Sequence, residues 1–343
     1  MKNETRVKFE GFVAQVANLN GVADATKTFS VDPSVQQKLE GKIQLSSEFL
    51  SKINMPGVTE QEGEKLGLGV TGTIAGRTNT KNSPRKPRSV ADMSKGRYRC
   101  VQTNFDTAYP YAQLDMWAKF PHFQTTLRDQ IVTQQALDRI MIGFNGTFIA
   151  ADTDRVKYPL LQDVNIGWLE KYRTEAPARV MKEVAGAGKI TIGKGGHYAN
   201  LDALVFDAIN NLIDVQFRKD PDLVVILSDD LLADKYFPIL NKDNPPTEQL
   251  AADVVISQKR IGNKPAYTVP FFPSGTMLIT KFSNLSLYYQ EGGRRRHVRE
   301  EPEYDQIANY ESSNDAYVVE VYETGCLIEH IEVVDGADAV GGA

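Results

Sequence analysis

Residues 121–146, PHFQTTLRDQIVTQQALDRIMIGFNG, form the longest helical pattern in the chain, and we expect the rest of the fold to be organised around it. Pro121 suits the first turn, where its missing N–H would lack a partner in any case, and Asn145-Gly146 supplies residues that commonly end a helix. About twenty-two helical residues would span roughly 33 Å, the width of a small domain. The pattern fits a long spine of the fold, and it also fits an ordinary core helix.

The apolar residues of this stretch predict which face of the helix is buried. At 100° per residue, the large apolar side chains fall on one side, although Gln134 and Asp138 interrupt the stripe. The expected buried face consists of Phe123, Leu127, Ile131, Leu137, Met141 and Phe144.

Two further helical patterns, residues 4–19 and residues 34–53, precede this stretch. Between them, residues 20–33 are mostly polar and end at a proline, which disfavours helix in the residue before it. We therefore expect the first helix to be tethered by a flexible connector and not embedded in the body. Its apolar face, formed by Phe9, Phe12, Val13 and Val16, would then be free to dock on a partner.

Residues 56–102 are rich in glycine, threonine and charged residues and poor in large apolar ones, so this segment cannot build a core of its own. Alternating apolar residues near its two ends predict two strands joined by a long, basic tip, that is, an extended hairpin. Because a hairpin of this length is only marginally stable alone, it must pack on its own body or on another chain, and we favour another chain. The alternating residues are Leu66, Leu68 and Val70, then Tyr98 and Cys100.

The second half of the chain predicts a mixed α+β unit. The continuous apolar run at 223–227, LVVIL, suits a strand covered on both faces, and a helical pattern at 229–240 follows it directly. Residues 317–322 and 326–334 are expected to pair as a hairpin about Glu323-Thr324-Gly325. Further helices are expected at 168–174 and 201–213, and further strands at 189–192, 254–257, 266–269, 277–280 and 285–289.

The composition describes a globular protein with a slightly acidic balance. The chain has 343 residues, 41% of them hydrophobic, a formal net charge of −5 and a pI near 5.6, which argues against a dedicated nucleic-acid binder. The two cysteines, Cys100 and Cys326, are too few for a disulfide framework. Early charges exclude a signal peptide, and no run approaches the eighteen apolar residues of a membrane span, so we expect a chain that starts in the cytosol.

No stretch of the sequence predicts an active site. Gly193-Lys194-Gly195-Gly196 lacks the spacing of a phosphate-binding loop, and Asp229-Asp230 fits a helix start better than a catalytic pair. The four histidines have no partner at metal-ligand spacing. Arg294-Arg295-Arg296 suggests a turn held by salt bridges to the nearby glutamates, with phosphate binding as the alternative. We therefore expect no catalytic residue, no metal and no cofactor.

Several stretches closely resemble the major capsid protein of P2-like tailed bacteriophages. They include RVKFEGFVAQVANLNGV, KTFSVDPSVQQKL, EKLGLGVTGTIA, LDRIMIGFNGT, GWLEKYRTEAPARV, DLVVILSDDLLADKYFPI and LAADVVISQKRIGNKPA. The resemblance implies the HK97-like capsid fold. Its parts would be an N-terminal arm at 1–50, an extended E-loop hairpin at 51–103, a peripheral domain with the spine helix at 104–199, an axial domain at 200–313, and a return to the peripheral domain with the C-terminal tail at 314–343.

The resemblance also implies a function. Members of the family self-assemble into hexamers and pentamers that form the icosahedral head shell around double-stranded DNA. The implied partners are an internal scaffold that would dock on residues 4–19, a maturation protease that would cut within about 20–35, a portal protein, and packaged DNA bound non-specifically. The chain would be a virion capsid protein, assembled in the cytoplasm of the host bacterium, and no enzyme. The alternative is a cytosolic α+β enzyme that uses the hairpin as a mobile lid.

Two charged blocks suggest how subunits contact one another. Residues 77–99 carry eight basic side chains against Asp92 alone, a net charge of +7, whereas residues 300–338 carry twelve acidic side chains and no lysine or arginine. Complementary fields of this kind fix register between partners, although single exposed pairs contribute only about 0–1 kcal/mol. A solvated tip and a tip that touches DNA are the alternatives. The expected contact residues are Arg77, Lys81, Arg85, Lys86 and Arg88 on one side and Glu300, Glu301 and Glu303 on the other.

Overall fold

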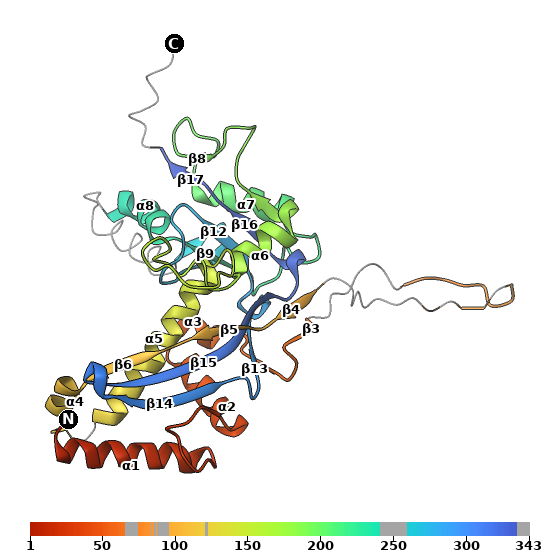
Figure 1. Cartoon of the computed structure of the whole chain (residues 1–343). Coiled ribbons are helices and arrows are strands. Elements are labelled where there is room, and N and C mark those ends of the chain that lie inside the picture. The colour runs from red at the N-terminus through yellow and green to blue at the C-terminus, as the bar shows by residue number, and fades with distance from the viewer. Residues whose placement is uncertain are drawn as a thin grey trace, which may run out of the picture.

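The two main β-sheets lie one above the other in the view of Figure 1. Helix α5 (Phe123–Asn145) runs from beside the larger, lower sheet toward the smaller, upper one. The structure is a computed structural model that describes residues 1–65, 75–82, 84–85, 87, 96–120, 123–240 and 259–334. Helix α1 (Asn3–Leu19) lies along the outer side of the lower sheet, and the hairpin leaves the body sideways. The mixture of helices and sheets is the α+β class that the sequence predicted.

The larger sheet is built on β15 (Gln306–Val319), which pairs antiparallel with a broken strand on each side. One side carries β13 (Leu285–Gln290) and then β14 (Arg295–Glu301), and the other carries β5 (Val101–Asn104) and then β6 (Thr107–Pro110). Two short strands extend the edges, namely β1 (Phe29–Ser30) beside β14 and β2 (Gly57–Val58) beside β13.

The smaller sheet has the strand order β10-β11-β9-β12-β16-β7. Its central strand β9 (Val224–Leu227) is buried at every position, as its continuous apolar run predicted. The other strands are β7 (Val180–Met181), β10 (Arg260–Ile261), β11 (Lys264–Thr268), β12 (Met277–Thr280) and β16 (Cys326–Ile328).

Shorter elements complete the fold. Two pairs of strands stand apart from the main sheets, β3 (Glu62–Glu64) with β4 (Arg97–Arg99) and β8 (Ile190–Ile192) with β17 (Ile331–Val333). The remaining α-helices are α2 (Pro33–Leu45), α3 (Glu48–Lys52), α4 (Tyr111–Trp117), α6 (Trp168–Glu175), α7 (Leu201–Leu212) and α8 (Asp229–Leu240). The 3-10 turns are η1 (Pro177–Arg179), η2 (Phe282–Asn284), η3 (Pro302–Tyr304) and η4 (Tyr322–Thr324).

Aromatic packing around Trp168 joins the two sheets to the spine helix. The Trp168 ring is fully buried, with its centroid 5.2 Å from those of Phe144 on α5 and Tyr317 on β15, and its indole N–H donates to the Ser286 carbonyl at 3.0 Å. A side chain at Gly143 would collide with this ring, so Gly143 serves the close crossing of α5 and α6 inside the helix. One core therefore spans the α5–α6 crossing and reaches both sheets.

The helix α5 confirms the predicted bounds, but the predicted buried face was wrong. Of the expected stripe, Phe144 is buried, whereas Leu127, Ile131, Leu137 and Met141 are only half-buried. The side chain of Phe123 lies outside the described part of the structure. The face that packs inward instead carries Val132, Gln135, Ala136, Arg139 and Ile140. Because two of these residues are polar, an apolar periodicity points to the wrong side of the helix.

The predicted C-terminal hairpin was also wrong. Strand β15 ends in the larger sheet, the chain crosses through η4, and β16 joins β12 and β7 in the smaller sheet. All three residues of β16 are buried, and the strand pairs along both edges, with β12 and β7, and not with β15. Strands β13 and β14, which fall within 200–313, share the larger sheet with β15. The predicted strand at 254–257 lies outside the described residues.

A network of buried charges joins α2, α5 and the larger sheet. Arg139 and Arg294 are both fully buried, and the Glu40 carboxylate lies between them, accepting hydrogen bonds from both guanidinium groups. Arg139 also bonds Asp315 on β15 at 2.9 Å, and Arg294 bonds Glu311 on β15 at 2.6 Å. The expected salt-bridged turn at 294–296 is therefore wrong, since Arg294 points into the core and Arg295 and Arg296 begin strand β14.

The energetics of this network depend on every partner being present. Burial would raise the pKa of Glu40, but the two guanidinium groups outweigh it and hold the pKa below its ordinary value. The pKa of Glu311 is lowered in the same balance, between burial and the charges of Arg294 and Arg296. A buried ion that loses its partner is strongly destabilising, because nothing then offsets its desolvation.

We therefore expect Glu40→Gln to lower the free energy of unfolding by about 3–5 kcal/mol, as for other buried pairs that lose one charge. Urea unfolding at neutral pH measures the change. The matched control is Glu48→Gln, which removes an exposed carboxylate paired with Lys52 at 2.7 Å and should cost about 0–1 kcal/mol. A loss for Glu40→Gln no greater than that of the control would contradict a structural role for the network.

The destabilisation caused by Glu40→Gln should depend on pH. Because the folded-state pKa of Glu40 is depressed, its contribution is present above the ordinary carboxylate range and is lost as pH falls through the folded pKa. The difference between wild type and Glu40→Gln should accordingly shrink as the solution is acidified. A difference that stays constant down to the acid limit of folding would show that the charge of Glu40 does not carry the effect.

Candidate interaction surfaces

The N-terminal helix is docked on the larger sheet, contrary to the expected free tether. Val16 and Ala17 are buried in a small apolar cluster with residues of the connector, and β1 pairs with β14 through Phe29 and Arg296. Arg6 forms an ion pair with Glu300 at 2.8 Å. The connector looked flexible because its apolar residues are widely spaced in a polar run; they are Ala25, Phe29 and Val31.

The four candidate docking residues on α1 pack against other elements of the same subunit. Val16 is buried, and Phe12 and Val13 pack against the connector cluster. Phe9 packs with Val13 against Leu114, Val298 and Ile307, at the other end of the sheet. The scaffold role of these residues stays a prediction, while Val7 and Leu19 are the large apolar side chains of α1 that remain exposed.

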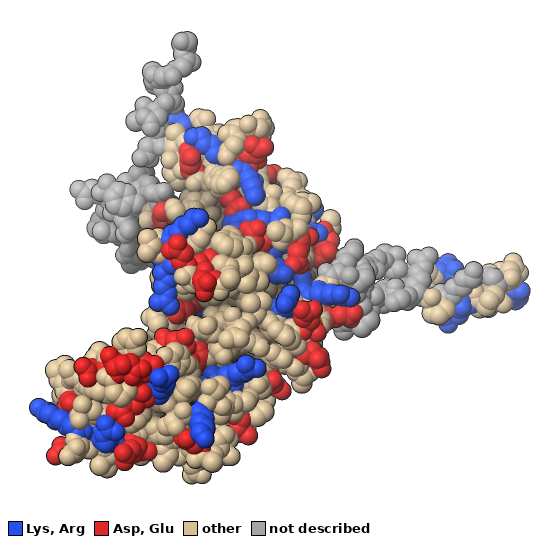
Figure 2. Space-filling view, viewed as in Figure 1, with Lys and Arg blue, Asp and Glu red and all other residues tan. Residues whose placement is uncertain are grey.

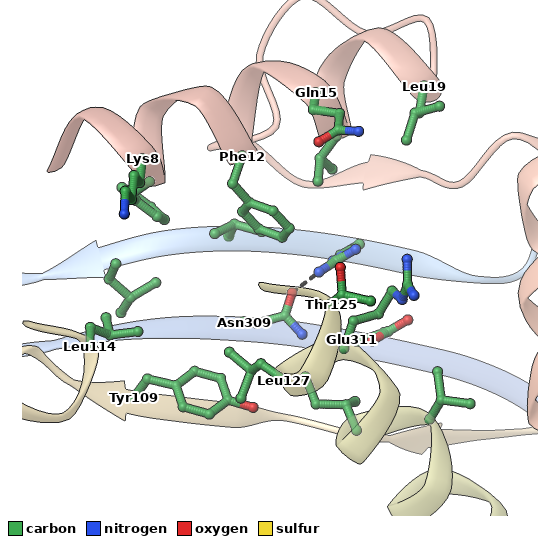
Figure 3. A pocket seen from close by; sticks show the side chains of 18 of the residues that line it. Lys8, Phe12, Gln15, Leu19, Tyr109, Leu114, Thr125, Leu127, Asn309 and Glu311 are labelled. Carbon is green, nitrogen blue, oxygen red and sulfur yellow. Dashed lines mark hydrogen bonds between the residues drawn. The ribbon is translucent and has the colours of Figure 1, made fainter. Parts of the chain in front are cut away.

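A groove of about 340 Å³ lies between α1 and the first half of α5 (Figure 3). Phe12 and Leu19 of α1 line one wall, Leu127 lines the opposite one, and strands β6, β14 and β15 form the floor. On this floor Arg296 donates from Nε to Asn309 at 2.7 Å, and its guanidinium lies 5.8 Å from the Phe12 ring centroid. Burial lowers the pKa of Arg296. The groove is thus mainly apolar, with one cationic group at its base.

The described basic residues of the hairpin between 75 and 87 are exposed. They are Arg77, Lys81 and Arg85, and blue atoms lie at the outer end of the projection in Figure 2. The predicted contact residues Lys86 and Arg88, and the predicted strand residues at 66–70, lie outside the described residues. Where the hairpin meets the body, β3 and β4 pair antiparallel, and Tyr98 is buried with its ring 5.0 Å from that of Tyr288.

Much of the acidic block is already paired within the chain. Glu301 is 5% exposed and accepts hydrogen bonds from Tyr310 and Gln306, and Glu300 pairs with Arg6. Glu303 is about half-exposed and lies 3.4 Å from Arg299. The charge count over 300–338 did not reveal these pairings because the cations, such as Arg6 and Arg299, lie outside that range. The other paired acids are Glu311, Asp315, Glu329 and Glu332.

Asp230, one of the two acids that follow strand β9, makes structural hydrogen bonds. Asp230 at the start of α8 accepts hydrogen bonds from Ser274 and from the Gly275 backbone, which ties the helix to the loop before β12. Within the described ranges, no group of three or more His, Cys, Asp or Glu side chains is placed to hold a metal ion. None of the helices in that part of the chain combines the length and apolar character needed to cross a bilayer.

Comparison with known proteins finds close relatives over almost the whole chain. A family model described as phage major capsid protein, P2 family, matches residues 8–331. The chain is 52% identical over 344 residues to the "Capsid proteins" of Escherichia phage P2, covering 98% of this chain and 96% of that protein. It is 45% identical over 339 residues to the major capsid protein of Serratia phage KSP20, covering 96% and 97%.

A solved structure supports the same relationship. The chain is similar to one in the "Satellite phage P4 procapsid including size determination (Sid) protein", with a TM-score of 0.83 and 49% identity, covering 98% of this chain and 99% of that one. The fold is the HK97-like capsid fold, as the resemblance implied, and none of these comparisons supports the alternative of a cytosolic enzyme. The chain belongs to the P2 family of phage major capsid proteins.

Proposed function

We propose that this protein builds the icosahedral head shell of a tailed phage, through hexamers and pentamers that enclose double-stranded DNA. The observation that carries the proposal is the 52% identity to a phage P2 capsid protein over nearly all of both chains. The similarity to a procapsid chain supports a shell as the assembled form. In this role the protein acts through contacts between subunits and not as an enzyme.

The two lobes of the subunit correspond to the two domains that we propose. We assign the lobe around the larger sheet and α5 to the peripheral domain, and the lobe around the smaller sheet, α7 and α8 to the axial domain at the centre of a capsomer. The HK97-like fold and the two sheets support this assignment. The ranges that follow are the arm at 1–50 and the hairpin at 51–103, with β13 and β14 added to the peripheral domain.

The partners of the shell are also proposals. We propose an internal scaffold that meets the arm, a protease that trims it during maturation, a portal protein at one vertex, and non-specific contact with packaged DNA. Assembly would take place in the cytoplasm of the host bacterium. The position of α1 on the outer side of the larger sheet supports a role for the arm, because a terminal helix bound through one face can be removed without opening the main core.

The purified protein should assemble. We expect negative-stain microscopy of concentrated protein, alone or coexpressed with the scaffold of its phage, to reveal shells, rings or tubes. Wild type and Glu48→Gln, an exposed change away from the groove and hairpin, should behave alike. If the protein stays a monomer under all these conditions, including coexpression with its scaffold, the shell proposal fails.

The hairpin tip should contribute to assembly through its charge. Reversal of Arg77, Lys81 and Arg85 to glutamate should leave a folded subunit, since all three are exposed, but should slow assembly measured by light scattering. The matched control replaces the same three residues with glutamine, and its assembly rate should fall between wild type and the reversal. Added salt should slow wild type more than the glutamine variant, because screening acts on the charges.

Two outcomes would contradict this pairing. Normal shells at the wild-type rate from the glutamate variant would show that the tip charges do not join subunits. Normal shells that package DNA poorly would assign the tip to DNA instead. In either case the shell proposal itself would stand, because it depends on assembly and not on this particular contact.

A further inference from the structure

The hairpin meets the body at Lys65 and Gly96. Lys65 follows β3, Gly96 precedes β4, and the Lys65 N–H donates to the Gly96 carbonyl at 2.8 Å. A side chain at Gly96 would collide with the aliphatic part of Lys65, so a glycine opposite leaves room for the lysine side chain. The two residues adjoin β3 and β4, which lie where the hairpin meets the body (Figure 1).

The Lys65 side chain turns back into the body. Only 6% of it is exposed, and its ammonium lies 3.3 Å from Glu175 Oε2 and 3.4 Å from Tyr322 Oη. The same ammonium is 4.5 Å from the centroid of the Tyr322 ring. Tyr322 donates to Glu175 at 2.7 Å, and Lys171 bonds the other oxygen of that carboxylate at 2.6 Å. Lys65 therefore occupies a closed site made of two other elements.

These elements belong to the junction between the two sheets. Glu175 ends helix α6, and Tyr322 lies in η4, where the chain crosses from β15 to β16. The Tyr322 ring packs 5.3 Å from that of Tyr172, which is fully buried in the main core. Tyr98 anchors β4 to the larger sheet, and Lys65 anchors the other strand of the hairpin to this junction.

Such a placement is unusual for a lysine, whose ammonium normally reaches water. Burial lowers the pKa of Lys65, and the attraction of Glu175 only partly offsets that effect. A buried ion pair of this kind adds little net stability compared with an apolar pair. The effect of the Lys65–Glu175 pair is instead to hold these side chains in the one geometry that their hydrogen bonds require.

We propose that Lys65 is a positioning residue that clamps the base of the hairpin to α6 and η4 and thereby sets the direction in which the hairpin leaves the subunit. The direction of the hairpin's base is then set by the junction between the two lobes. The consequence for shells rests on the proposed function, since a neighbouring subunit can be reached only along the right direction. The clamp itself is a property of the single subunit and is tested there.

The test measures the distance between the hairpin and the body in monomeric subunits by spin labelling. Labels are attached at Arg97→Cys on β4, at the described base of the hairpin, and at Phe206→Cys on α7, both at exposed positions. The natural thiols Cys100 and Cys326 are buried, and burial raises the pKa of each to about 12, so they do not compete for the label at neutral pH. We expect one narrow distance distribution for this labelled protein.

Lys65→Met in the labelled protein should shift and broaden that distribution. Glu175→Gln, which leaves the hairpin sequence intact, should do the same, and the double variant should be no broader than either single one. The matched control is Lys189→Met, which breaks an exposed pair with Glu332 and should leave the distribution unchanged. The unfolding midpoint of each variant is measured as well, and the distance distributions are compared between variants of equal stability. A changed direction of the hairpin can then be told apart from a general loosening of the fold.

An unchanged distribution in Lys65→Met would overturn the proposal, and so would a change in Lys65→Met without one in Glu175→Gln. If Lys65→Met does not fold, Glu175→Gln alone decides, because it removes the anion from the clamp and keeps the lysine. Assembly of the same variants is then followed by microscopy. Loss of the narrow distribution with normal shells would keep the clamp and remove its role in assembly, while failure of wild type to assemble would instead affect the proposed function.

Discussion

Two buried guanidinium groups determine how this subunit is put together. Arg139 and Arg294 are completely removed from water, and an isolated buried charge is far too costly to retain. Each must therefore meet carboxylates, and these come from α2 and from two positions on β15. The requirement fixes the rotation of α5, the seat of α2 and the register of β15 at the same time. Apolar packing alone tolerates sliding, whereas this arrangement of hydrogen bonds does not.

The rest of the molecule can be understood as a fixed body with two attachments. Around the network lies a core that includes Trp168 and reaches both sheets, so the lobes share one interior. The arm helix α1 and the hairpin lie outside this core and are bound by smaller contacts, an apolar cluster for the arm and the Tyr98 and Lys65 anchors for the hairpin. A shell subunit needs this combination, because its body must keep one shape while its extensions reach neighbours and partners.

Local patterns in the sequence predicted the elements better than their contacts. The bounds of α5 and the buried strand β9 follow from periodicity and composition. The inward face of α5 could not be predicted in this way. Gln135 and Arg139 are buried on that face only because they bind partners far away in sequence; Glu40, for example, is separated from Arg139 by 99 residues. No local signal marks Glu40 or Lys65 as structural.

The charge count did not reveal the pairings within the chain for the same reason. It treated residues 300–338 as a free acidic surface, whereas Arg6, Arg139, Arg173, Lys189 and Arg294 neutralise much of it within the chain. The crossing from β15 to β16 was missed because a short apolar strand can join either sheet, and only the tertiary structure decides between them. The family resemblance, in contrast, supplied the fold, since the matching stretches extend over nearly the whole chain.

The central claim is that the buried charges make α2, α5 and β15 one cooperative unit, and hydrogen exchange of the monomeric subunit tests it most directly. The account predicts that backbone amides in α2 around Glu40 exchange at the slow rate of those around Arg139 and Asp315, while α1 exchanges faster. If α2 instead exchanges as fast as α1 while α5 and β15 stay protected, the charges do not hold the arm to the body and the account is wrong.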